Sequence, residues 1–164
     1  MKALFIGGIK SGKSTKAEKY TLNLSKQKPI YLATTEFIDE EMAEKIALHK
    51  QNRKSDFITV EEPLALADVI EKQESVVLVE CVSMWINNML YHEKSYEDML
   101  LEMQKVLALK QDIVFVFNDV GASVVSENAL AREFVNISGK LSQFIASECD
   151  EVYYTIAGIA SRIK

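Results

Sequence analysis

The sequence is poor in the residues that characterise fibrous, disulfide-bonded and low-complexity proteins. Its 164 residues include six glycines, two prolines and two cysteines, Cys81 and Cys149. So little glycine and proline excludes a collagen-like or low-complexity chain. The two cysteines lie in apolar stretches without metal-ligand spacing, which favours reduced thiols in a cytoplasmic protein over a disulfide framework or a zinc site.

Long apolar runs and an excess of basic residues are also missing. No apolar run approaches the roughly 18 residues that span a bilayer, and the N-terminus lacks the features of a signal peptide. The net charge of −5 argues against a nucleic-acid-binding surface. With 48% hydrophobic and 26% charged residues, the composition is globular, and the length fits one domain over residues 1–164 without a membrane or nucleic-acid partner.

Short apolar runs alternate with longer amphipathic segments along the chain. Strands are expected at residues 2–6, 29–33, 57–60, 75–79, 112–117 and 151–156. Helices are expected at residues 12–26, 38–53, 61–71, 82–91, 96–109 and 127–147, the last being one helix or two helices interrupted at Gly139. This alternation predicts an α/β fold, in which helices cover both faces of a mostly parallel sheet.

The segment 82–109 is the longest stretch without a strand. It carries nine large apolar residues: Met84, Trp85, Ile86, Met89, Leu90, Met99, Leu100, Met103 and Leu107. A helix pair needs fewer to cover its own sheet, so we expect part of this surface to contact another subunit. The alternative is an internal layer of the core.

A glycine-rich segment follows the first expected strand and matches the phosphate-binding pattern G-x-x-x-x-G-K-S without deviation. It consists of Gly7, Gly8, Ile9, Lys10, Ser11, Gly12, Lys13 and Ser14. Its glycines let backbone N–H groups approach phosphate oxygens, and the following helix directs its positive end at the same anion. The pattern predicts a P-loop nucleoside triphosphatase fold, with Lys13 on the β and γ phosphates and Ser14 on Mg²⁺.

A P-loop needs a carboxylate to organise Mg²⁺. Glu80 ends the expected strand 75–79, where such a group normally lies, so Glu80 and Ser14 are the predicted metal ligands. Asp119, after the strand 112–117, is the competing carboxylate, and both are eligible as the base of a kinase. The guanine-reading motif Asn-Lys-x-Asp is missing, since residues 118–121 share only its first residue, Asn118.

The two histidines differ in their surroundings. His92 lies at a polar helix end, where we expect it to be solvated. His49 ends the apolar face of the expected helix 38–53, with Lys50 and Arg53 close behind. From the residues alone, His49 is either a packing residue or a nucleophile whose neutral form the basic neighbours favour.

These segments resemble the bifunctional adenosylcobinamide kinase / adenosylcobinamide-phosphate guanylyltransferase family of cobalamin biosynthesis. Two strings are the most specific: residues 41–50, which read E-M-x-x-K-I-x-x-H-K, and residues 118–121, which read N-D-V-G where the family usually has N-E-V-G. Residues 31–34, 59–63, 79–85 and 127–134 also match. The resemblance runs nearly from end to end.

The resemblance implies a RecA-like P-loop enzyme with two activities. It would phosphorylate adenosylcobinamide with a nucleoside triphosphate, GTP or ATP, and then transfer GMP from GTP to the new phosphate through a guanylyl-histidine at His49. The nucleotide site would include residues beyond the P-loop: Ala33, Thr34, Thr35, Lys50, Gln51, Asn52, Arg53, Glu61 and Glu80. With Lys13 and Glu80, His49 would be catalytic. The family also implies a homotrimer.

Two other functions fit parts of the sequence. One is a P-loop kinase of another small-molecule alcohol, with His49 only structural. The other is a GTP-binding regulator without enzymatic activity, against which the missing Asn-Lys-x-Asp motif counts. Neither of these two functions predicts a covalent protein–nucleotide adduct, which the two-activity function implied by the family resemblance does.

Overall fold

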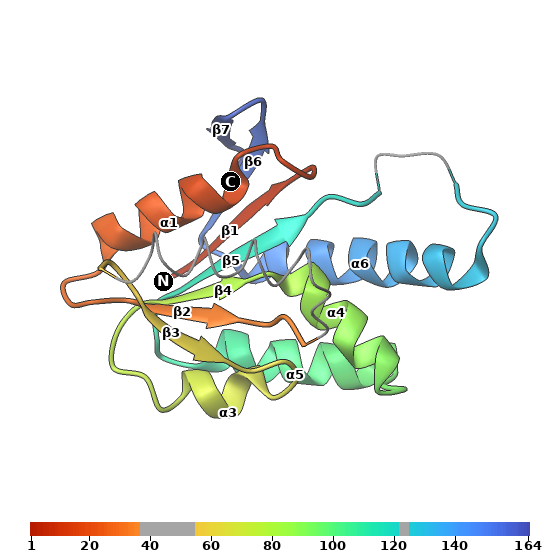
Figure 1. Cartoon of the computed structure of the whole chain (residues 1–164), viewed down its shortest axis with the longest axis horizontal. Coiled ribbons are helices and arrows are strands. Elements are labelled where there is room, and N and C mark those ends of the chain that lie inside the picture. Colours follow the sequence, from red (N-terminus) through yellow and green to blue (C-terminus); the bar gives the residue numbers. More distant parts are fainter. Residues whose placement is uncertain (37–54, 122–124) are drawn as a thin grey trace.

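A computed structural model describes residues 1–36, 55–121 and 125–164 (Figure 1). These residues form a seven-stranded sheet with the order β3-β2-β4-β5-β1-β6-β7, in which only the pairing of β6 with β7 is antiparallel. The strands are β1 (Lys2–Gly7), β2 (Ile30–Ala33), β3 (Ile58–Glu61), β4 (Val77–Glu80), β5 (Ile113–Asn118), β6 (Glu151–Ile156) and β7 (Ile159–Arg162). The predicted mostly parallel α/β sheet is confirmed.

Helices lie on both faces of the sheet (Figure 1). The described helices are α1 (Lys13–Leu24), α3 (Leu66–Ile70), α4 (Val82–Tyr91), α5 (Tyr96–Ala108) and α6 (Ala129–Glu148). Helix α1 packs against β1, β4, β5 and β6 on one face, while α4 and α6 pack against β5 and β1 on the other face. Helices α3 and α5 pack against each other beside them.

The alternation of side chains along the central strands divides the core into two layers. Ile113, Phe115 and Phe117 of β5 point to the face of α3 to α6. Val114 and Val116 point to the opposite face, where Ala17 of α1 covers them. All of these side chains are buried, as expected for central strands of a parallel sheet with both faces covered.

The segment 82–109 forms α4 and α5, and most of its large apolar side chains pack in the core of this chain. Five of the nine residues are buried in the core layer, namely Trp85, Ile86, Met89, Met99 and Met103. Leu90, Leu100 and Leu107 pack against the same layer as partly buried side chains. The internal layer therefore accounts for most of this surface, and the surplus gives little support for a subunit contact.

Several boundaries differ from those expected. The segment expected as a helix over residues 61–71 is helical only over α3, because Glu61 extends β3 and the Glu62 carboxylate then accepts the N–H groups of Leu64 (2.9 Å) and Ala65 (2.8 Å) in a turn. Helix α6 is continuous through Gly139. Strand β7 was not expected, and the helix predicted over residues 38–53 lies outside the described residues.

The parallel strands bring the ends of separate chain segments to one edge of the sheet. Gly7 is in register with Asn118, and Ala33 with both Glu61 and Glu80. We call this the carboxyl edge, and parallel α/β sheets bind their ligands there. Among the described residues, no helix is long and apolar enough to cross a membrane.

Candidate nucleotide site

The P-loop connects β1 to α1 and needs glycine at two positions for different reasons. A Cβ atom on Gly7 would lie 2.3 Å from the Thr155 carbonyl oxygen, so any side chain there would collide with β6. Gly12 precedes α1 with φ of 90°, in the left-handed region that favours glycine. The glycines of the sequence pattern therefore follow from close packing at Gly7 and from backbone geometry at Gly12.

Lys13 and Ser14 begin α1 and point back over the loop. Lys13 is only 6% exposed, and its Nζ atom donates to the Gly8 carbonyl oxygen at 3.2 Å. The Ser14 hydroxyl donates to Oε1 of Glu80 at 2.8 Å. The sequence prediction that a serine of the P-loop and a carboxylate at the end of β4 come together is thus seen directly.

The pair Ser14 and Glu80 has the chemistry of a magnesium site of the P-loop kind. Mg²⁺ prefers hard oxygen ligands and is usually held by one or two protein groups together with substrate phosphates. A hydroxyl and a carboxylate 2.8 Å apart at the mouth of the loop fit that pattern. Within residues 1–36, 55–121 and 125–164, no cluster of three or more His, Cys, Asp or Glu side chains forms a metal cage.

The turn between β6 and β7 braces the P-loop from the side. Ala157 and Gly158 both have positive φ, of 50° and 78°, which is typical of a two-residue hairpin turn. The Gly158 N–H donates to the Ser11 carbonyl oxygen at 2.8 Å, and a Cβ atom on Gly12 would lie 3.2 Å from the Gly158 Cα atom. Sequence analysis missed this contact, and the Ala157-Gly158 pair was the available signal.

The end of β5 places Asn118 and Asp119 beside the P-loop. The Asp119 N–H donates to the Gly7 carbonyl oxygen at 2.9 Å, which extends the β1–β5 pairing by one residue. The Asp119 carboxylate accepts from the Tyr154 hydroxyl at Oδ2 (3.0 Å) and from the Gly121 N–H at Oδ1 (3.2 Å). The hydrogen bond from the Tyr154 hydroxyl to the Asp119 carboxylate raises the pKa of Tyr154 above its ordinary value. The Tyr154 phenol therefore stays protonated.

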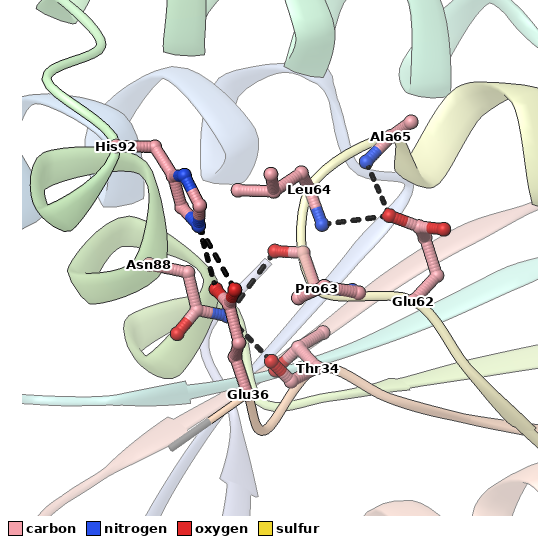
Figure 2. Close-up of polar contacts among 8 residues, drawn as sticks. All are labelled: Thr34, Glu36, Glu62, Pro63, Leu64, Ala65, Asn88 and His92. Carbon is pink, nitrogen blue, oxygen red and sulfur yellow. Dashed lines mark hydrogen bonds and ion pairs between the residues drawn. The ribbon is translucent and has the colours of Figure 1, made fainter.

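The chain that leaves β2 is held by side chains (Figure 2). Asn88 on α4 is fully buried, and its amide nitrogen donates to the carbonyl oxygens of Thr34 (2.5 Å) and Pro63 (3.1 Å). The Thr34 hydroxyl is also buried, where it accepts from the Cys81 N–H at 3.0 Å and donates to the Cys81 carbonyl oxygen at 2.9 Å. Thr34 thus joins β2 to the end of β4, and its side chain does not face solvent.

His92 is exposed, as expected, and it also pairs with a carboxylate. Its Nε2 atom lies 2.9 and 3.0 Å from the two carboxylate oxygens of Glu36, the last described residue before the gap at 37–54 (Figure 2). The two side chains are 37% and 27% exposed. Asn88 and His92 are one helical turn apart, so one face of α4 contacts two points of the chain beyond β2.

The structure brings part of the predicted site together at the carboxyl edge. Ala33, Glu61 and Glu80 are in register, and the P-loop residues Gly7, Gly8, Ile9, Lys10, Ser11, Gly12, Lys13 and Ser14 follow β1 at the same edge. Thr35 is half-buried just beyond β2. The predicted residues His49, Lys50, Gln51, Asn52 and Arg53 lie outside the described residues.

The chain matches a protein-family model described as "Cobinamide kinase / cobinamide phosphate guanyltransferase" over residues 3–163. It is 34% identical to the bifunctional adenosylcobalamin biosynthesis protein CobU of Escherichia coli, with 100% of both chains covered. It is also 34% identical to CobP of Pseudomonas aeruginosa, a protein with the same description, covering 100% of this chain and 98% of that relative. The CobU protein of Salmonella typhimurium is 32% identical with full coverage of both.

Solved structures with a similar fold are more distant in sequence. The flagellar accessory protein FlaH of Methanocaldococcus jannaschii superposes with a TM-score of 0.52 at 13% identity, covering 99% of this chain and 77% of that one. An ATPase of the type III secretion system of pathogenic bacteria superposes with a TM-score of 0.53 at 16% identity, covering 93% and 51%. At these identities the likeness shows the fold alone, which is that of P-loop nucleoside triphosphatases.

Proposed function

The chain belongs to the cobinamide kinase / cobinamide phosphate guanyltransferase family, and from this membership we propose that it catalyses two successive transfers. In the first, GTP or ATP phosphorylates the hydroxyl group of adenosylcobinamide. In the second, GMP passes from GTP to that phosphate, giving adenosylcobinamide-GDP and pyrophosphate. The observation that carries the proposal is the P-loop, with a buried Lys13 and with Ser14 bonded to Glu80.

Both transfers use the same triphosphate-binding groups. The backbone N–H groups of the P-loop bind phosphate oxygens, and Lys13 neutralises charge on the β and γ phosphates. Ser14 and Glu80 would hold Mg²⁺, which when bound supplies further neutralisation of the triphosphate. Ala33, Thr35 and Glu61, together with the main chain at Thr34, are taken to contact the nucleoside end of the ligand; the register of Ala33 with Glu61 at the carboxyl edge supports this.

His49 is the proposed nucleophile of the second transfer. Direct attack by the adenosylcobinamide phosphate on GTP would bring two anions together, whereas a neutral imidazole meets less repulsion. An imidazole nitrogen bonds to the α-phosphorus, the bond from that phosphorus to the bridging oxygen breaks, and pyrophosphate leaves. An oxygen of the adenosylcobinamide phosphate then bonds to the same phosphorus, and the phosphorus–nitrogen bond breaks to restore His49.

The residues that follow His49 in sequence complete the proposed site. Lys50, Gln51, Asn52 and Arg53 are taken to bind the guanine nucleotide, in keeping with the family resemblance. Two of them are cationic, which suits a ligand that carries phosphates.

Incubation with GTP labelled in its α-phosphate, followed by denaturation, tests this function. We expect one acid-labile GMP on the peptide that contains His49, because a phosphorus–nitrogen bond survives unfolding but not acid. In His49→Ala the adduct should disappear and guanylyl transfer should fall by roughly 10³-fold or more, as for other lost nucleophiles. Phosphorylation of adenosylcobinamide should remain measurable, since it requires no attack on the α-phosphorus.

His92→Ala is the matched control, because it removes the other histidine. It should retain the adduct and both activities. A kinase of some other alcohol would give no adduct and no phosphorylation of adenosylcobinamide, and a GTP-binding regulator would give no transfer at all. An adduct that maps to His92 or to a lysine would contradict the proposed role of His49.

The surroundings of the enzyme and its assembly are part of the proposal. Cys81 and Cys149 are both buried free thiols, and burial raises the pKa of both, that of Cys149 to about 12, so neither forms the reactive thiolate readily. Reduced, unreactive thiols suit the cytoplasm.

We expect a homotrimer on the basis of the family resemblance, and light scattering at micromolar concentration that gave the mass of a single chain would contradict it.

A further inference from the structure

The end of β5 occupies a particular place relative to the proposed triphosphate. In the sheet, β5 lies between β1, which leads into the P-loop, and β4, which ends in Glu80. A residue just beyond β5 is therefore flanked by the end of β1, where the phosphate-binding loop begins, on one side and by the end of β4, where Glu80 lies, on the other. Asp119 is that residue, and its main chain is fixed to Gly7 by a hydrogen bond of 2.9 Å.

Two hydrogen bonds orient the Asp119 carboxylate and leave it able to accept another. One oxygen accepts from Tyr154 and the other accepts from the Gly121 N–H, so that both oxygens are held in place. A carboxylate offers about four acceptor positions, so capacity remains for a further donor. Asp119 is half-buried, so part of the residue remains accessible from outside the fold.

Glu80, the other carboxylate at this edge, has a different task. Its Oε1 atom accepts from Ser14, the residue whose hydroxyl meets Mg²⁺ in P-loop proteins. The attacking alcohol must approach the γ-phosphorus in line with the leaving oxygen, from the side opposite to it. A carboxylate that binds Mg²⁺ is poorly placed to accept a proton from an alcohol on that side.

We infer that Asp119 is the base of the kinase step and that Tyr154 is its positioning residue. The inference rests on the proposed function and assigns a group to one of its two reactions. The substrate hydroxyl donates to Asp119, and its oxygen bonds to the γ-phosphorus. The bond between that phosphorus and the β–γ bridging oxygen breaks, the nucleoside diphosphate leaves with those electrons, and the hydroxyl proton passes to the Asp119 carboxylate.

Placement matters more than basicity in such a step. The transition state of phosphoryl transfer is loose, so the proton leaves late and the main requirement is an oriented acceptor. Tyr154 supplies that orientation from β6, and because its phenol stays protonated it remains a donor throughout. The arrangement also separates the two activities, since guanylyl transfer to a phosphate requires no removal of a proton from an alcohol.

The two activities of one chain give the test an internal control. Kinase activity is measured with adenosylcobinamide, and guanylyl transfer is measured separately with adenosylcobinamide phosphate supplied as the substrate. Asp119→Asn should lower kcat of the kinase step by roughly 10²- to 10⁴-fold, the usual contribution of a general base. Guanylyl transfer should stay within about threefold of the wild-type rate, which shows that the variant folds and binds nucleotide.

Three further variants sharpen the result. Asp119→Glu should restore most kinase activity, because it returns the carboxylate. Tyr154→Phe should lower kcat of the kinase step by about tenfold with KM nearly unchanged, as expected for a misdirected base. Glu80→Gln should lower both activities, because it acts on the shared triphosphate site.

Two outcomes would overturn the assignment. One is an Asp119→Asn variant with wild-type kinase activity, and the other is an equal loss of both activities in Asp119→Asn that Asp119→Glu does not restore. A wild-type protein that lacks both activities would instead overturn the proposed function, and the assignment with it. The two failures are therefore distinguishable in one set of assays.

Discussion

On the β1 side of the carboxyl edge the P-loop is held mainly by main-chain hydrogen bonds. On the β2 side, the side chains of Asn88 and Thr34 add to two main-chain hydrogen bonds, from the Thr34 N–H to Glu80 and from the Glu62 N–H to Ala33. Around the P-loop the N–H groups of Asp119, Gly158 and Ser11 donate to carbonyl oxygens of the loop and of Gly7. Beyond β2, the corresponding carbonyl of Thr34 is bonded by the amide of Asn88 (Figure 2).

This contrast explains why one side is visible in the sequence and the other is not. Main-chain bracing requires close approach, so it demands glycine where a Cβ atom would collide, as at Gly7. Side-chain bracing requires only one residue with the right donor. Asn88 is such a residue, and one polar residue inside a helix has no local signature.

The largest effect is expected on the β1 side, from Lys13→Ala. Both transfers need charge neutralisation on the triphosphate, so we expect each activity to fall by roughly 10³-fold or more. Stability should change little in the absence of nucleotide, since within the described part of the chain the Nζ atom donates only to Gly8. Steady-state assays of the two activities, together with urea unfolding, measure these effects separately.

Lys16→Ala is the matched control for this variant. Lys16 is exposed on the same helix, one turn beyond the loop. Its substitution therefore removes the same charge without altering the phosphate site. Its two activities should remain within about twofold of wild type at moderate ionic strength. Near-normal activity of either kind in Lys13→Ala would contradict a shared site.

The fold was predictable because its signals are local. The six expected strands match β1 to β6 closely, and the buried strands β1, β2, β4 and β5 appear in the sequence as continuous apolar runs. Strand β7 was missed because its residues are mostly exposed and lack such a run. The helix expected over residues 61–71 was too long, since the sequence does not show that the Glu62 carboxylate turns back on its own chain.

The site was predictable only where a motif carries it. The P-loop was predicted from its residue pattern and Glu80 from its place at the end of the expected strand 75–79, and the Ser14–Glu80 hydrogen bond shows that the two lie together. The link from Asp119 to Tyr154 joins residues 35 positions apart and depends on the order of β5, β1 and β6. Strand order is a tertiary property, so no local pattern reveals this pair.

A smaller effect, on stability, is expected on the β2 side from Asn88→Ala. The substitution leaves two acceptors without their donor, the carbonyl oxygens of Thr34 and Pro63. Each such loss costs about 1–3 kcal/mol when the group is buried. We expect the free energy of unfolding to fall by roughly 2–4 kcal/mol, measured by urea unfolding monitored through Trp85.

Asn87→Ala offers a control one position away on α4. Asn87 is exposed, so its loss should change the free energy of unfolding by less than about 0.5 kcal/mol. If Asn88→Ala were equally mild, the β2 side would be held by something other than this amide, and the contrast between the two sides would be wrong.

The smallest effect is expected from the pair of Glu36 and His92, which lies on the same side but nearer the surface. With side chains 27% and 37% exposed, the two groups remain partly hydrated, and such pairs contribute about 0–1 kcal/mol. A double-mutant cycle of Glu36→Gln and His92→Asn should give a coupling energy in that range, measured by urea unfolding. At a pH where the imidazole is protonated, the coupling should decrease when the ionic strength is raised, because salt screens partly exposed charges. A coupling above about 2 kcal/mol that did not respond to salt would rank this pair with Asn88 and show that the surface of α4 braces the β2 side as strongly as its buried face.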